Sequence, residues 1–274
     1  MDYRMPGTKK KLIPEKKAEL EIPLGVTCEY HGRTGNNIFQ YVFARLLAEK
    51  NGLAMDTAWI HPDFVRMTPP APGDRFVDPI VQINDLYWNQ HDVDWFAKDF
   101  RGKRVMCSGF FQSPMYYDRH TDLVKSFFDL DKVDKRPKSE IVMHLRLDDY
   151  ADPGLQSVIN HTWYAKILTS MQFNTKKHKL YIVTDPKSKG DPYLRKFVIA
   201  YQPTIVSNTA AEDFHFMREF DTILCSNSSF AWWAAWLSEA SRIFTFSKWI
   251  REPHGQRIKL AMTKRATPVY GDWM

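Results

Sequence analysis

The sequence predicts an α/β protein in which most strands run parallel. In the second half of the chain, short apolar runs alternate with segments of helical periodicity, an order that builds a parallel sheet with ligand sites at the carboxyl ends of its strands. Near the start, an apolar run is followed by a glycine-containing turn and then by helical periodicity. With 274 residues, 44% of them hydrophobic, the chain is long and apolar enough for two small domains or one large one.

The first 23 residues are predicted to form a polar, basic leader. Its lysines gather between positions 9 and 17, and the net charge of the whole chain is +6. A solvated leader and one that makes peripheral contact with an acidic membrane or with nucleic acid are both open interpretations. The sequence has no apolar signal-peptide core and no apolar run near the ~20 residues that span a membrane. We therefore expect a soluble or cytoplasmic protein.

A first domain is expected over residues 24–135, beginning with a strand, a turn and a helix. Phe39, Val42, Phe43, Leu46 and Leu47 recur at helical spacing. Prolines and charged residues mark the loop and the linker that follow. The predicted elements are a strand over Leu24–Tyr30, a helix from Ile38 to Asn51, a loop over Met67–Asp78, a strand over Val105–Phe111 and a linker over Asp129–Ser139.

A second domain is expected over residues 136–274, where strands and helices alternate. The predicted strands are Ile141–Leu147, Leu180–Thr184, Thr222–Cys225 and Arg242–Phe246. The predicted helices are Trp163–Met171, Ala211–Phe220 and Phe230–Ala240.

The three cysteines, Cys28, Cys107 and Cys225, are too few and too widely spaced for a disulfide framework or a metal site. Cys28 and Cys225 lie in apolar runs, so buried, unreactive thiols are expected.

Three polar motifs each follow a predicted strand. In Ser226-Asn227-Ser228-Ser229-Phe230, hydroxyls at a helix start lie beside free backbone N–H groups and the positive end of the helix dipole, which suits phosphate binding without a metal. Plain helix capping is the alternative.

The second motif, His144-Leu145-Arg146, ends a strand whose alternation places His144 and Arg146 on one face. Arg146 is able to clamp a diphosphate and neutralise a departing phosphate. The alternative is a buried arginine paired with Asp148 or Asp149.

The third motif, from Gly32 to Asn37, combines two glycines that let the backbone approach a ligand with donors from Arg33, Asn36 and Asn37. A surface turn is the alternative.

Further along, Asp213 is able to accept both the ring N–H and the exocyclic amine of guanine, a match that uracil does not offer. An exposed acidic residue in a first helical turn is the alternative.

Together these motifs resemble the α-1,2-fucosyltransferase family and its relatives, the α-1,6- and protein O-fucosyltransferases. The matching segments are Gly32-Arg33-x-Gly35-Asn36-Asn37-x-Phe39-Gln40-Tyr41, Gly109-Phe110-Phe111-Gln112-Ser113, His144-x-Arg146 with Asp149-Tyr150, and Asn227-Ser228-Ser229-Phe230-Ala231-Trp232-Trp233-Ala234-Ala235-Trp236-Leu237.

The resemblance implies a GT-B architecture of two facing Rossmann-like domains. It also implies an inverting transferase that moves fucose from GDP-fucose to a glycan acceptor without a metal or cofactor, forming an α-1,2 linkage. The implied catalytic residues are Arg146, Asn36 and Asp149. The implied nucleotide-sugar-binding residues are Gly32, Arg33, Gly35, Asn37, His144, Asp213, Asn227, Ser228, Ser229 and Phe230.

Two departures from the family pattern keep other functions open. Leu147 stands where the family has a second arginine, and Asn37 stands where it has glutamine. The alternatives are therefore a related transferase that uses another nucleotide sugar and a glycan- or nucleotide-binding protein without catalysis. Nucleic-acid binding rests on the leader alone and is not expected.

Overall fold

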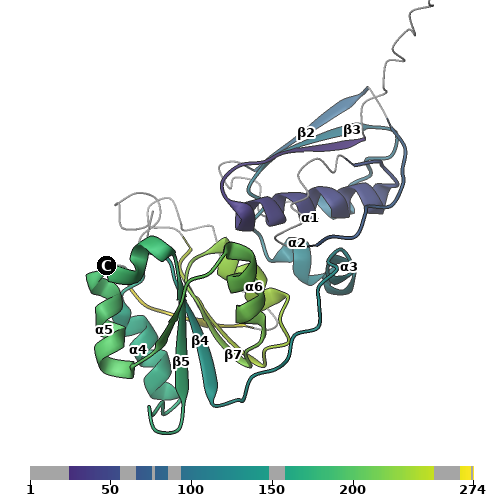
Figure 1. Ribbon diagram of the computed structural model, residues 1–274. Coiled ribbons are helices and arrows are strands. Elements are labelled where there is room, and N and C mark those ends of the chain that lie inside the picture. Colours follow the sequence, from purple (N-terminus) through teal and green to yellow (C-terminus); the bar gives the residue numbers. More distant parts are fainter. Residues whose placement is uncertain are drawn as a thin grey trace, which may run out of the picture.

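The computed structural model describes residues 25–55, 66–75, 78–85, 94–147, 158–249, 266–272 and 274. Two parallel sheets dominate this part of the chain, one of three strands and one of six. Figure 1 shows the smaller sheet in an upper unit and the larger sheet in a lower one. The predicted fold class, two α/β units with mostly parallel sheets, is confirmed.

The smaller sheet has the order β1-β3-β2 and is covered by one long helix, α1. Its strands are β1 (Val26–Glu29), β2 (Ile80–Asp85) and β3 (Arg104–Gly109). The helix α1 spans Thr34–Asn51 and ends at Gly52, whose φ of 65° places it in the left-handed region that favours glycine. The helix therefore begins four residues before the predicted start at Ile38, so Gly35, Asn36 and Asn37 lie in its first turn.

The larger sheet has the order β6-β5-β4-β7-β8-β9. All six residues of its central strand β4 (Glu140–Leu145) are buried, because the sheet is covered on both faces. The other strands are β5 (Lys179–Thr184), β6 (Thr204–Val206), β7 (Thr222–Cys225), β8 (Arg242–Phe246) and β9 (Ala266–Val269).

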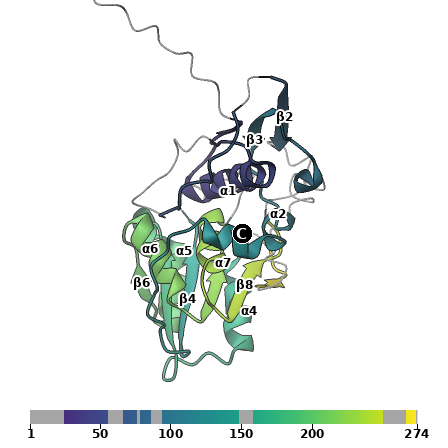
Figure 2. The same ribbon diagram turned by 90° about the vertical axis from the view of Figure 1, so that its right-hand side faces the viewer.

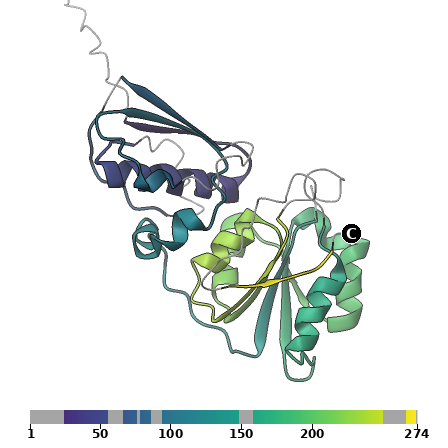
Figure 3. The ribbon, with the colours of Figure 1, turned by 180° about the vertical axis from the view of Figure 1, so that it is seen from behind.

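Helices cover both faces of this sheet, as Figures 1 and 3 show. On one face, α4 (His161–Ser170) and α5 (Pro192–Tyr201) pack with Ile141, Met143 and Ile182 in one hydrophobic cluster. On the other face lie α6 (Ala210–Arg218) and α7 (Ser229–Trp236), which join a second cluster.

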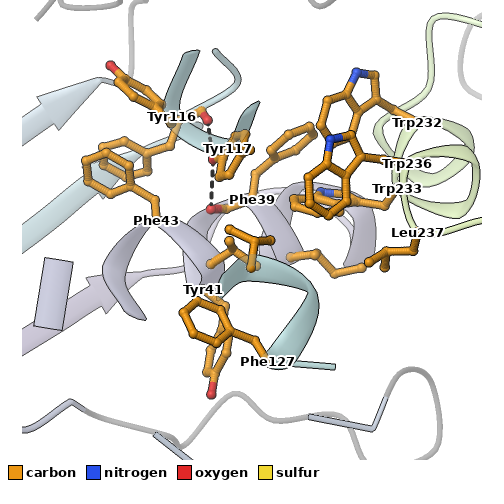
Figure 4. Packing of buried hydrophobic residues seen from close by; sticks show 14 of the residues in the cluster. Phe39, Tyr41, Phe43, Tyr116, Tyr117, Phe127, Trp232, Trp233, Trp236 and Leu237 are labelled. Carbon is orange, nitrogen blue, oxygen red and sulfur yellow. Dashed lines mark hydrogen bonds between the residues drawn. The ribbon is translucent and has the colours of Figure 1, made fainter. Parts of the chain in front are cut away.

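This second cluster extends from the larger sheet into the smaller unit. Figure 2 shows α1 directly above α7, and Figure 4 shows the tryptophans of α7 against Phe39 of α1. The Phe39 ring lies 4.8 Å from that of Trp232 and 4.9 Å from that of Trp233. The hydroxyl of Tyr117, in α2 (Met115–Asp118), donates to the Phe39 carbonyl at 3.2 Å. The two units therefore share one core.

Between the sheets the chain forms α2, α3 (Thr121–Ser126) and then the irregular segment 129–139 that was predicted as a linker. The predicted strands Thr222–Cys225 and Arg242–Phe246 are confirmed at both ends. The predicted helix over Phe230–Ala240 is wrong at its end, because α7 stops at Trp236. None of the described helices has the length and apolar character needed to cross a membrane.

Candidate functional site

A cavity of about 520 Å³ opens between the two units, at the carboxyl ends of β4 and β5 and beside the first turns of α1, α6 and α7. Ten of the predicted site residues line it. These are Gly32, Arg33, Gly35, Asn36, His144, Arg146, Asp213, Ser228, Ser229 and Phe230. Residues nearly 200 positions apart in the sequence thus meet in one pocket.

Arg146 follows β4 directly, and Asp185 follows β5 directly. Because Leu145 and Thr184 are paired across these two strands, the residues after them are neighbours. The Arg146 guanidinium donates to the Asp185 carboxylate at 3.3 Å, and the two side chains are 14% and 24% exposed. The alternative drawn from the sequence paired Arg146 with Asp148 or Asp149, and both of these lie outside the described part of the chain. Asp185 is a carboxylate partner that the sequence analysis did not name.

His144 is buried in the floor of the pocket. Its Nδ1 lies 2.7 Å from the Ser226 hydroxyl, and its ring packs 5.6 Å from that of Phe230. Burial, together with the charge of Arg146, lowers the pKa of His144 to about 3. The ring is therefore neutral near pH 7, where one ring nitrogen donates and the other accepts a hydrogen bond.

Asp213 lies in the first turn of α6, which begins with a capping box formed by Thr209 and Glu212. The Asp213 Oδ1 accepts hydrogen bonds from the backbone N–H of Asn208 at 3.1 Å and from its amide at 3.2 Å. Burial raises the pKa of Asp213, and these two bonds oppose the rise. Among the described residues, both bonds fall on Oδ1, which leaves Oδ2 for a ligand.

The first turn of α7 forms a second wall of the pocket. Ser228 is the N-cap residue, with extended backbone angles, but its side chain makes no capping hydrogen bond. Ser229 directs its hydroxyl to Asn36 at 2.7 Å. The backbone N–H groups of this turn are therefore not capped by a serine side chain, and they carry the positive end of the helix dipole into the pocket.

The turn before α1 closes the pocket from the smaller unit. Gly32 has a φ of 77°, a conformation that disfavours other residues. Gly35 lies so close to α7 that a Cβ atom built on it would be 2.4 Å from the backbone nitrogen of Phe230. Gly35 thus permits close packing of two helices, a role the sequence analysis did not assign to it.

Three predicted site residues do not line the pocket. Asn37 is buried and donates to the His31 carbonyl at 3.1 Å and the Gln40 side chain at 3.0 Å. Asn227 is also buried, and its amide lies 3.5 Å from the Trp249 carbonyl. Both hold loops in place below the pocket surface. Asp149 lies outside the described residues.

Sequence reasoning gave no site role to several residues of the pocket lining, among them Asp185, Asn208, Gln112 and Trp249. Asp185 carried a signal, because it ends a predicted strand of the same sheet as Arg146. Gln112 was part of a matched segment without a role of its own. Asn208 and Trp249 carried no signal, because each lies in a loop that only the tertiary fold brings to the pocket.

The cysteines are free thiols outside the pocket lining. Burial raises the pKa of Cys28 to about 12 and raises that of Cys225, which fits the unreactive thiols expected. In the described ranges, no group of three histidine, cysteine or acidic residues is arranged to hold a metal ion.

No family model matches the chain, and a comparison with curated proteins finds no match. Among solved structures, the chain is similar to a mutant of FUT1 from Arabidopsis thaliana in complex with GDP. The TM-score is 0.47 at 11% identity, and the alignment covers 88% of this chain and 73% of that one. At such low identity, the residues of the pocket must carry any assignment of function.

Proposed function

We propose that the chain is an inverting glycosyltransferase that moves fucose from GDP-fucose to a hydroxyl of a glycan, without a metal ion. One observation carries the proposal: Arg146, the first turn of α7, His144 and Asp213 line the same pocket as the glycine turn before α1. A nucleoside diphosphate needs a positive site for its phosphates and a polar site for its base, and this pocket offers both.

Arg146 and the first turn of α7 would hold the diphosphate. Both lie at the pocket wall, and both direct positive charge into it. When the bond to the sugar breaks, negative charge grows on the β-phosphate. A guanidinium held by Asp185 meets that charge without first having to reorganise, which is how fixed charges lower a barrier. These groups take the place that a metal ion has in other transferases.

His144 and Asp213 would recognise the base. In the same pocket, Oδ2 of Asp213 is an acceptor for the N–H groups of guanine. The imidazole N–H of His144 or the amide of Asn208 would supply a donor for the guanine carbonyl. Uracil lacks the adjacent ring N–H and exocyclic amine, so the set favours guanine. We therefore propose GDP as the nucleotide.

The glycan would enter from the smaller unit, where Gly32 and Asn36 line the pocket. We propose the α-1,2 linkage from the resemblance in sequence. Asp149 is proposed as the group that receives the proton of the acceptor hydroxyl, and it follows Arg146 by three positions.

A second candidate is a transferase that uses another GDP-sugar. Its support comes from Leu147, the residue at the position of the second family arginine. Leu147 is 2% exposed and packs in the hydrophobic cluster beneath α4 and α5, outside the pocket lining. Position 147 therefore supplies no charge to the ligand, and the sugar end of the site differs from the family pattern.

A panel of nucleotide sugars tests the proposal. Calorimetry with GDP-fucose, GDP-mannose, UDP-galactose and UDP-N-acetylglucosamine should find binding of GDP-fucose, and released GDP should increase when a galactose-terminated glycan is added. The same reaction in EDTA should proceed at the same rate. Turnover of GDP-mannose alone would favour the second candidate. Binding of the donor without release of GDP over a glycan panel would favour a binding protein, and activity restored only by manganese would contradict the metal-free mechanism.

A further inference from the structure

Three hydrogen bonds lie at the edge of the pocket, and two of them link the two units. The indole N–H of Trp249 donates to Gln112 Oε1 at 3.0 Å, and Gln112 Nε2 donates to Asn36 Oδ1 at 2.8 Å. The Ser229 hydroxyl donates to the same Asn36 oxygen at 2.7 Å. Trp249 and Gln112 are 5% and 4% exposed, so water does not compete for these bonds. All four residues line the pocket.

The direction of these bonds is fixed at one end by chemistry. An indole N–H donates and never accepts. Gln112 must therefore turn its oxygen to Trp249 and its amide nitrogen to Asn36. Asn36 must in turn face Gln112 with its oxygen. Ser229 does not decide the orientation, because a hydroxyl both donates and accepts.

The outcome is an N–H donor at the pocket surface. With its oxygen committed to Gln112 and Ser229, Asn36 turns its Nδ2 toward Gly32: a Cβ atom on that glycine would lie 2.3 Å from this nitrogen. In the described part of the chain, the Asn36 nitrogen is committed to no hydrogen bond. The group it suits is an acceptor, such as a phosphate oxygen or a sugar oxygen.

We propose that Trp249 and Gln112 are positioning residues that set the orientation of the Asn36 amide, so that Asn36 donates a hydrogen bond to the bound donor substrate. The identity of that substrate rests on the proposed function, whereas the orientation of the amide does not. A purely structural role is the alternative. The same bonds would then stabilise the contact between the two units, and the orientation of the Asn36 amide would have no effect on ligand affinity.

Two substitutions separate these roles. Gln112→Glu keeps an acceptor for Trp249 but offers Asn36 only oxygens, so Asn36 must turn its nitrogen away from the ligand. We expect at least a tenfold weaker affinity for GDP-fucose. Trp249→Phe keeps an aromatic ring at this position but removes the indole N–H, so the Gln112 amide is able to adopt either orientation and we expect a smaller loss of affinity, of a few-fold. Trp163→Phe is the matched control, because its indole N–H donates at 2.9 Å to the Val269 carbonyl, away from the pocket lining, and its ligand affinity should not change.

The double variant gives the sharpest result. Once Gln112→Glu has turned Asn36, Trp249→Phe has nothing further to change, so the double variant should bind GDP-fucose as Gln112→Glu does. Losses that add would indicate a structural role and overturn the proposal, as would a Gln112→Glu variant with wild-type affinity. Parallel titrations with GDP identify the contacted atom: a loss for both ligands indicates phosphate, and a loss for GDP-fucose alone indicates the sugar.

A ligand-free measurement keeps this inference distinct from the proposed function. Asn36→Asp retains the oxygen that accepts from Gln112 and Ser229 and replaces only the nitrogen. Its urea midpoint should therefore match that of the wild type, whereas Gln112→Glu should lower the midpoint. If the wild-type protein binds no nucleotide sugar, the proposed function fails, and these midpoints still decide the orientation. A clear loss of stability in Asn36→Asp would show that the protein forms its hydrogen bonds with the amide nitrogen of Asn36 instead of its oxygen, and would overturn the proposal.

Discussion

Arg146 is the residue on which the chemistry of the pocket depends most. Its guanidinium lies at the end of β4, 3.3 Å from Asp185, and the pocket contributes no second arginine from position 147. Replacement by alanine should lower kcat by about 100-fold or more, the usual effect of removing one fixed donor at a developing charge. Arg146→Lys should restore only part of the rate, because an ammonium lacks the planar pair of donors.

Melting temperatures of the same preparations provide the control for Arg146. The alanine variant leaves Asp185 without its cation, so a modest loss of stability is expected, and Arg146→Ala combined with Asp185→Asn should recover it. A folded Arg146→Ala protein that retains most of its donor hydrolysis would rule out the leaving-group role.

His144 makes stability depend on pH in a defined range. Its pKa is about 3 in the folded protein, against 6.5 for an ordinary histidine. Between these values the unfolded chain binds a proton that the folded protein does not bind, so stability falls as the pH falls below 6.5. From pH 7.5 to pH 5, His144 should cost the wild type about 2 kcal/mol of unfolding free energy. Urea unfolding of His144→Asn at pH 7.5 and at pH 5 should show a difference in unfolding free energy that is smaller than that of the wild type by about 2 kcal/mol. An unchanged difference would contradict the neutral, buried ring.

Among the residues of the pocket, the sequence analysis identified most of those whose side chains are charged or able to ionise. Arg146, His144 and Asp213 do line one pocket, because His144 and Arg146 lie at the carboxyl end of β4 and Asp213 lies in the first turn of α6, which packs on the same sheet. Asn37 and Asn227 belong to the same motifs but are buried beneath the pocket. A motif does not reveal which of two adjacent amides faces a ligand, because that depends on where the helix begins.

The contact between α1 and α7 is the central packing relation between elements. The first turns of both helices meet at Gly35, where a Cβ atom would overlap the backbone of α7. Gly35→Ala should therefore separate the helices, lower the unfolding free energy by about 1–3 kcal/mol and weaken nucleotide binding. Gly190→Ala is the matched control, because a Cβ atom there meets nothing within 4 Å. Thermal melts of both variants test this; equal melting temperatures would contradict the close contact.

Predicted elements agree best with the structure where apolar runs are short, bounded and central. The strands β7 and β8 are of this kind. The edge strands β2, β6 and β9 were not predicted. β6 has three residues, and β9 contains Pro268 and is largely exposed. The helix α5 was not predicted, although its N-cap residue is Asp191 and its first residue is Pro192. A proline at the first position is common in helices. The start of α1 was misplaced because its first turn is polar.

On the scale of the whole molecule, the shared core explains why a pocket forms between two units. Phe39 of α1 and the tryptophans of α7 belong to one hydrophobic cluster that reaches both sheets. This packing holds the glycine turn before α1 opposite the strand ends of the larger sheet. The alternation of strands and helices in the second half of the chain was predictable from hydrophobic periodicity, whereas the placement of one unit on the other depends on side-chain contacts between segments that are distant in the sequence.

The central claim, that the pocket between the units recognises a guanine nucleotide, is tested most directly by titrating GDP and UDP into the wild type and into Asp213→Asn by calorimetry. We predict that the wild type binds GDP at least tenfold more tightly than UDP. In Asp213→Asn the difference should shrink, because the lost contact to guanine is worth about 1–3 kcal/mol. UDP binding as tight as that of GDP, or an Asp213→Asn variant with an undiminished preference for GDP, would contradict the account.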